Sequence, residues 1–114
     1  MKLYLCAIEP GDEEADLSHT TIEVNTPRGT MPVYVNRADD DRAAPVVLIY
    51  MDAPGIRPAL HGHAERLAKA GYTTLLPDLY YPFNPADRPN PEKLAVRDPE
   101  EFKRMRALTA RICR

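Results

Sequence analysis

The sequence contains few cysteines, no long apolar run and no excess of charge of either sign. Cys6 and Cys113 are its only cysteines, and they stand near opposite ends without the spacing of a metal site. They could form one disulfide at most, and in a cytoplasmic protein both would stay reduced. No apolar stretch approaches the roughly 18 residues that a membrane-spanning helix needs. The formal net charge of −2 offers no field that would attract nucleic acid or anionic lipid. These absences favour a cytoplasmic protein that binds neither nucleic acid nor membranes.

The N-terminal segment differs in character from the rest of the chain. Its first eight residues are mostly apolar, but acidic residues follow at once, so the apolar stretch is too short for a signal peptide. Pro10 and Gly11 stand beside the acidic residues and favour a flexible conformation. We predict an acidic, flexible lead-in over residues 1–17. One small domain is predicted over residues 18–114, because a chain of 114 residues allows no more.

Two short stretches with strand character follow the lead-in. Residues 21–25 alternate polar and apolar side chains, and residues 31–35 form a second strand-like run. Pro27, Arg28 and Gly29 between them are a turn signal. The sequence therefore predicts a β-hairpin.

Residues 45–76 predict a strand, a helix and a second strand. Residues 45–51 are continuously apolar, which is typical of a parallel strand covered on both faces. A helix is expected next, because Pro58 suits its first turn and Gly71 its end. Apolar residues recur there at the helical period, namely Leu60, Ala64, Leu67 and Ala68. Residues 72–76 are the second apolar strand, and the whole order is that of a βαβ unit.

The C-terminal part is predicted to be a loop followed by a helix. Residues 80–91 are rich in proline. Asp98 then stands where a helix cap is expected, with Pro99 in the first turn and Glu101 reaching back to the cap. Side chains at the helical period give this helix one mainly apolar face; they are Phe102, Met105, Leu108, Thr109 and Ile112. The chain ends where we would expect the next strand.

Neither a metal site nor a bound cofactor is expected. His61 and His63 are two residues apart on the predicted helix, so they point in different directions. No G-x-G-x-x-G motif follows the first strand of the βαβ unit, which disfavours a bound nucleotide.

Several short motifs resemble the dienelactone hydrolase family of α/β-hydrolases. The apolar strand ends in M-D-A-P-G at residues 51–55, and the helix carries H-A-E-R-L-A at residues 63–68. A-G-Y at residues 70–72 then leads to L-L-P-D-L-Y at residues 75–80. The resemblance covers about residues 18–112, roughly the first half of a family member. It implies an α/β fold, a partial α/β-hydrolase with an N-terminal β-hairpin, a βαβ unit and a C-terminal helix, truncated before the nucleophile elbow. It also implies hydrolysis of small-molecule esters or lactones through a covalent acyl-enzyme.

The residues that would carry this chemistry are missing from the sequence. Family members place a cysteine or serine nucleophile in G-x-C-x-G or G-x-S-x-G, with an acid and a histidine following. Neither motif occurs here, the only serine is Ser18, and all three histidines precede the position where the nucleophile would come. The catalytic triad is therefore absent. We expect the chain to be inactive unless a second polypeptide supplies the other half.

The resemblance leaves a few candidate residues of the pocket. It assigns the backbone N–H of Ala53 as one oxyanion donor, because Pro54 has no N–H to donate. Asp52 stands where the family has a glutamate that interacts with the nucleophile, although a polar residue that accepts backbone hydrogen bonds at a strand end is an equal alternative. Tyr80 and Tyr81 are candidates for substrate binding or for packing under the loop. Tyr81 also stands where family members commonly have an arginine that holds a substrate carboxylate.

Two interpretations of function stay open. The first is an ester or lactone hydrolase of the dienelactone hydrolase family whose chain is inactive alone. The second is a small non-catalytic α/β module that binds a partner, or self-associates, through an open sheet edge. Asp78 is interpreted as a residue that fixes the turn after the second strand. The strand at residues 46–51 needs neighbours on both edges, so we predict exposed apolar surface and an unpaired edge.

Overall fold

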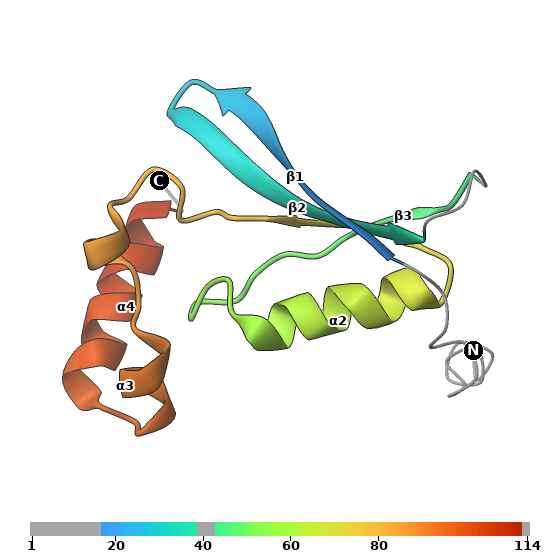
Figure 1. Cartoon of the computed structure of the whole chain (residues 1–114). Coiled ribbons are helices and arrows are strands. Elements are labelled where there is room, and N and C mark those ends of the chain that lie inside the picture. Colours follow the sequence, from blue (N-terminus) through green and yellow to red (C-terminus); the bar gives the residue numbers. More distant parts are fainter. Residues whose placement is uncertain (1–16, 39–42, 113–114) are drawn as a thin grey trace.

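The computed structural model describes residues 17–38 and 43–112. The strands β1 (Leu17–Thr26), β2 (Gly29–Ala38), β3 (Val46–Leu48) and β4 (Thr73–Pro77) form one sheet in the order β1–β2–β4–β3 (Figure 1). The helices are α2 (Pro58–Lys69), the short 3-10 helix η2 (Pro85–Asp87), α3 (Pro91–Ala95) and α4 (Pro99–Ile112). Cys6, Cys113 and residues 1–16 of the predicted lead-in lie outside the described residues, so the predictions about them stay untested.

β1 and β2 form the predicted hairpin, and each strand is longer than the segment predicted for it. Their antiparallel register runs from Leu17 opposite Ala38 to Thr26 opposite Gly29. Gly29 has a φ of 131°, a conformation that strains any residue with a side chain, so glycine suits this turn. The pairing extends beyond the alternating segment because the ladder joins backbone groups and does not require apolar side chains.

β3, α2 and β4 form the predicted βαβ unit. β3 and β4 pair in parallel, with Val46 opposite Thr73 and Leu48 opposite Leu75. α2 packs on one face of the sheet and buries Leu60, Ala64 and Ala68. Gly71 follows the helix with a φ of 106°, which agrees with its predicted place at the helix end.

β3 is covered on only one face by the described residues, whereas its apolar run predicted cover on both. Val46 and Leu48 are 61% and 47% exposed. α2 is the described helix that packs on the strands, and α3 and α4 lie beyond the end of β4 (Figure 1). This exposure agrees with the exposed apolar surface predicted for this strand, because the described residues supply a helix on only one of its faces.

The pairing of β2 with β4 joins the hairpin to the βαβ unit. The two strands are antiparallel, with Val33 opposite Pro77 and Asn36 opposite Thr74. Thr74 and Leu76 of β4 are completely buried. The Thr74 hydroxyl is within 3.4 Å of the Asn36 C=O and 3.3 Å of the Ala64 C=O in α2. The main core therefore lies between β4 and α2.

A second, smaller apolar cluster lies beyond the end of β4. Tyr80, Phe83 and Leu108 are buried there, and Met51 and Ile112 pack against them. The rings of Tyr80 and Phe83 meet edge to face with their centroids 6.4 Å apart. This cluster attaches α4 to the loop after β4. Within residues 17–38 and 43–112, no helix has the length and apolar character needed to cross a membrane.

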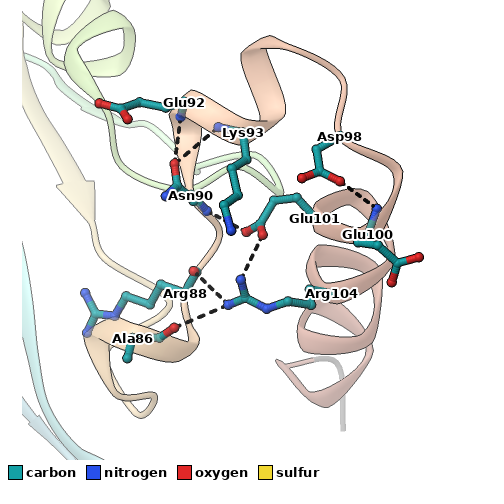
Figure 2. A network of polar contacts seen from close by, with 9 residues as sticks. All are labelled: Ala86, Arg88, Asn90, Glu92, Lys93, Asp98, Glu100, Glu101 and Arg104. Carbon is teal, nitrogen blue, oxygen red and sulfur yellow. Dashed lines mark hydrogen bonds and ion pairs between the residues drawn. The ribbon is translucent and has the colours of Figure 1, made fainter.

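A buried carboxylate ties α4 to the proline-rich loop (Figure 2). The Glu101 side chain accepts hydrogen bonds from the Asn90 N–H and from the Arg104 guanidinium, both at 2.8 Å. Glu101 is only 2% exposed. Arg104 also donates to the C=O groups of Ala86 and Arg88. The loop is therefore held along several of its backbone groups.

Two capping contacts were predicted at the N-terminus of α4. The structure contains the one made by Asp98 and lacks the one expected from Glu101. The Asp98 side chain accepts a hydrogen bond from the Glu100 N–H at 3.0 Å, as expected of a cap. Glu101 was predicted to reach back to the cap, and this was wrong, because its carboxylate binds Asn90 instead. The spacing of residues within the helix could not reveal a partner in the preceding loop.

Replacing Glu101 is expected to destabilise the protein. In Glu101→Ala the Asn90 N–H and the Arg104 guanidinium lose their acceptor, which should lower the free energy of unfolding by about 1–3 kcal/mol. Urea denaturation followed by circular dichroism measures the change. The control is Glu100→Ala on the same helix, an exposed side chain whose loss should cost less than about 0.5 kcal/mol. Equal effects of the two variants would contradict a structural role for the buried carboxylate.

Candidate functional site

The segment after β3 forms a tight turn at the carboxyl end of the strand. A hydrogen bond of 2.9 Å from the Gly55 N–H to the Asp52 C=O closes it. The Ala53 N–H belongs to the same trans peptide as the Asp52 C=O, so it points in the opposite direction, out of the turn. It has no hydrogen-bond partner among the described residues. The turn therefore presents an unpaired backbone donor at the end of β3.

Tyr80 supports this turn from the segment after β4. Its side chain is 2% exposed, and its hydroxyl donates a hydrogen bond to the Ala53 C=O. Its ring lies against Gly55, where an added Cβ would stand 3.0 Å from two ring carbons. Gly55 has a φ of 88°. Both the backbone conformation and the ring therefore require glycine at this position.

Asp52 is paired with Arg57, a residue that the sequence analysis did not select. The guanidinium binds both carboxylate oxygens, with 2.7 Å between Nη2 and Oδ2, and it also donates to the Gly55 C=O at 3.0 Å. The hydrogen bond from Arg57 lowers the pKa of Asp52, partial burial opposes this shift, and the same contact raises the pKa of Arg57. The Asp52 side chain is 53% exposed, so the pair orients the turn more than it stabilises the fold.

Asp78 fixes the loop that follows β4, in agreement with its interpretation as a turn residue. It is buried, and its carboxylate accepts hydrogen bonds from the Tyr80 N–H and from the Arg88 guanidinium, each at 3.0 Å. Arg88 also donates to the Phe83 C=O at 3.2 Å. The sequence analysis missed Arg88 because an arginine within a proline-rich loop carries no local sign of its partner.

A cavity of about 240 Å³ opens beside the turn. Its lining includes Gly55 of the turn, together with Asp78, Tyr80 and Arg88 from the segment after β4. Tyr81 is not part of this lining, because its hydroxyl lies 2.7 Å from the Thr26 hydroxyl at the hairpin turn. Of the candidate residues, the structure brings Asp52, Ala53 and Tyr80 together and places Tyr81 apart from them.

The remaining polar candidates do not gather around this turn. Ser18 lies on β1, at the opposite edge of the sheet from β3. His61 contacts the Tyr34 ring edge to face at a centroid distance of 4.9 Å, and the His63 ring lies beside the Arg66 guanidinium. In the part of the chain that the structure describes, no three His, Cys, Asp or Glu side chains gather as a metal site would require.

The hairpin, the parallel βαβ unit and the turn after β3 together define part of an α/β-hydrolase fold. The model of the dienelactone hydrolase family matches residues 31–112, which is most of the chain. This protein belongs to the dienelactone hydrolase family.

A solved structure supports the fold. A protein provisionally named dienelactone hydrolase, from Klebsiella pneumoniae subsp. pneumoniae, matches with a TM-score of 0.58 and 22% sequence identity. The match covers 69% of this chain and 34% of that chain, so the matched part is about a third of the Klebsiella protein. At this identity the likeness shows the fold alone. No curated protein matches the chain.

Gly55 is expected to tolerate no side chain. Gly55→Ala should lower the free energy of unfolding by about 1–3 kcal/mol, because it strains the backbone and pushes Tyr80 away from the turn. The control is Gly62→Ala in α2, where an added Cβ meets no atom within 4 Å. That change should stabilise the protein by about 0.5–1 kcal/mol, since alanine favours a helix interior over glycine. Thermal unfolding of both variants measures the difference, and a harmless Gly55→Ala would disprove the contact with Tyr80.

Proposed function

We propose that this chain is part of a carboxylic ester or lactone hydrolase and supplies one backbone donor of its oxyanion hole. The observation that carries the proposal is the unpaired Ala53 N–H at the end of β3, in a chain that belongs to the dienelactone hydrolase family. When a nucleophile attacks an ester, negative charge develops on the carbonyl oxygen. A donor about 2.7–3.1 Å from that oxygen stabilises the charge.

The turn suits this role because its donor is held from two sides. Tyr80 binds the C=O of Ala53, while Arg57 joins Asp52 to the C=O of Gly55. A donor held in place needs no rearrangement when charge develops on the substrate. Arg57 also neutralises Asp52, whose negative charge would otherwise repel an oxyanion beside the turn. We therefore assign Asp52 the task of orienting the turn.

A second polypeptide segment supplies the other groups of the reaction in this proposal. A cysteine or serine attacks the ester carbonyl, and a histidine accepts its proton. The ester C–O bond then breaks to leave the acyl-enzyme, and the histidine returns the proton to the departing alcohol. The same histidine then activates the water that releases the acid, while a carboxylate holds the histidine in place. The sequence contains no G-x-C-x-G or G-x-S-x-G motif to provide the nucleophile. The chain alone is accordingly proposed to be inactive.

The substrate proposed for the completed enzyme is a small ester or lactone. Tyr80 lines the cavity beside the turn, and Tyr81 is half-buried near the hairpin; both stay proposed substrate contacts. Arg88 also lines the cavity, but Asp78 pairs with it. Because the Asp78–Arg88 pair carries no net charge, it does not offer a net positive charge to a substrate carboxylate. We therefore favour an uncharged ester over an ester that also carries a carboxylate.

The free edge of β3 favours a second candidate, a non-catalytic module that binds a partner or another copy of the chain. The Pro45 C=O and the Ile49 N–H bond to β4. Successive residues of a strand direct their backbone N–H and C=O groups to alternate sides. The N–H and C=O groups of Val46 and Leu48 therefore point to the edge of β3 that faces away from β4. No charged residue or proline within β3 blocks the addition of a strand there.

The isolated chain is expected to show no hydrolysis of a short-chain nitrophenyl ester above the buffer rate. The physical reason is that an oxyanion donor without a nucleophile cannot form an acyl-enzyme. Absorbance of the released nitrophenol measures turnover, and mass spectrometry after treatment with serine- and cysteine-directed probes detects a nucleophile. A variant with Cys6→Ser and Cys113→Ser controls for incidental thiol labelling. Turnover that disappears in this variant would locate a nucleophile in the chain and contradict the proposed inactivity.

The oxyanion role can be tested by grafting residues 31–112 into the Klebsiella protein in place of the matching segment. A hydrolytic graft should lose about 10²–10³ in kcat on Ala53→Pro, which removes the N–H. Ala53→Gly retains the N–H and should keep most of the activity. An Ala53→Pro graft as fast as its parent would exclude this donor, and a folded but inactive graft would count against a hydrolase role.

A further inference from the structure

A second cavity, of about 200 Å³, lies between the hairpin and α2. The two hairpin strands line it from the sheet, and α2, which contacts both strands, lines it from the other side (Figure 1). We name it the hairpin cavity. It shares no lining residue with the cavity beside the turn after β3. Its polar lining includes His19 and Thr21 of β1, Tyr34 and Asn36 of β2, and His61 and Glu65 of α2.

The fold determines which side chains surround the hairpin cavity. His19 stands opposite Asn36 in the register of the hairpin, and the side chains of such a pair lie on the same face of the sheet. The Thr74 hydroxyl is within 3.4 Å of the Asn36 C=O and 3.3 Å of the Ala64 C=O, so it holds β2 close to α2. Glu65 follows Ala64 directly. The three walls of the cavity are therefore kept at a fixed spacing.

Asn36 supplies a buried amide group to the cavity. The residue is only 4% exposed, and its side-chain oxygen accepts a hydrogen bond from His19 Nδ1. Within residues 17–38 and 43–112, no acceptor lies within hydrogen-bond distance of its side-chain N–H₂ group. In the same part of the chain, no polar side-chain atom is both fully enclosed and without a partner. The N–H₂ group therefore has to reach open space, and we place it in the hairpin cavity, which Asn36 lines.

Glu65 gives the cavity a negative charge. Its carboxylate is half-buried and forms no ion pair or hydrogen bond with any other described residue. Lys69 lies one turn further along α2 and does not belong to the lining. A carboxylate that is partly removed from water and lacks a partner favours the approach of a cation. The cavity is therefore suited to a positively charged ligand.

The size and polarity of the cavity identify the class of ligand. A cavity of about 150 Å³ can hold benzene, so one of about 200 Å³ holds roughly eight non-hydrogen atoms. A metal ion does not suit the lining, because the described residues contain no group of three metal-binding side chains. An organic ammonium group can donate its hydrogen bonds to the Glu65 carboxylate and to a hydroxyl such as that of Thr21. The Asn36 N–H₂ group needs an acceptor, which an oxygen atom beside the ammonium group provides.

We propose that the hairpin cavity binds a small organic amine that carries a hydroxyl or carbonyl oxygen beside its ammonium group. The ammonium group pairs with Glu65, and the neighbouring oxygen accepts a hydrogen bond from the Asn36 side chain. The site lies at the hairpin side of the sheet, where β2 and β4 separate β1 from the open edge of β3. It is therefore independent of the proposed hydrolysis and of any strand added at β3.

Two-dimensional amide NMR spectra of the full chain test the proposal during titration with ethanolamine at constant pH and ionic strength. We expect saturable shifts of the Asn36 side-chain N–H₂ signals and of the backbone signals of residues 61–65. Ethylene glycol has a hydroxyl in place of the ammonium group, and ethylamine lacks the hydroxyl. Each of these two compounds should bind with a Kd about tenfold or more above that of ethanolamine, because each loses one of the two contacts.

A pair of matched variants locates the binding site. Glu65→Gln removes the charge from the cavity with little change of shape, and should raise the Kd of ethanolamine about tenfold or more. Glu23→Gln makes the same change at an exposed carboxylate of β1 outside the lining, and should alter the Kd by less than about twofold. Unchanged signals from α4 show that each variant is folded.

Three results would overturn the proposal. The first is the absence of a saturable shift of the Asn36 N–H₂ signals with ethanolamine. The second is ethylene glycol or ethylamine binding as tightly as ethanolamine, which would remove the ammonium group or the oxygen from the recognised chemistry. The third is a folded Glu65→Gln variant that binds ethanolamine like the wild type.

Discussion

The antiparallel pairing of β2 with β4 is the contact on which the rest of the structure depends. It runs over residues 33–36 and 74–77 and joins the hairpin to the βαβ unit in one sheet. A two-stranded hairpin alone is marginally stable in water. As a member of a four-stranded sheet with α2 on one face, β4 buries Thr74 and Leu76 completely. The same pairing determines where β4 ends and where the chain turns at Asp78.

The position of the candidate site follows from the parallel direction of β4 and β3. β3 and β4 are parallel neighbours, so the segments that follow them leave from the same end of the sheet, where α/β proteins commonly bind their ligands. Tyr80 therefore reaches the turn after β3, binds the Ala53 C=O and occupies the space beside Gly55. In our proposal the Ala53 N–H, held in place by Tyr80 and Arg57, serves as one donor of an oxyanion hole. The geometry follows from strand order and not from any single motif.

The sheet that positions this turn also leaves one face and one edge open. Parallel strands are normally covered on both faces, and the matched part of this chain is about a third of the Klebsiella protein. In our proposals the segment that brings a nucleophile to β3 and a partner bound at the open edge of β3 would contact neighbouring parts of the same sheet.

Local patterns in the sequence were enough to predict the hairpin, the βαβ unit, the C-terminal helix and the family, but not the short helices η2 and α3. Alternation at residues 21–25 indicated the hairpin, and the apolar run at residues 45–51 with Pro58 and Gly71 indicated the βαβ unit. Motifs between residues 51 and 80 indicated the family that matches residues 31–112. The contacts between separate segments became visible only in the folded chain: Tyr80 with Ala53, Glu101 with Asn90, and Arg57 folded back on Asp52. The reason is that the periodicity of apolar residues depends on residues that are close together in the sequence. It indicates which face of a helix or strand has to be buried. The partner of a buried carboxylate or hydroxyl is chosen by the packing of the whole chain.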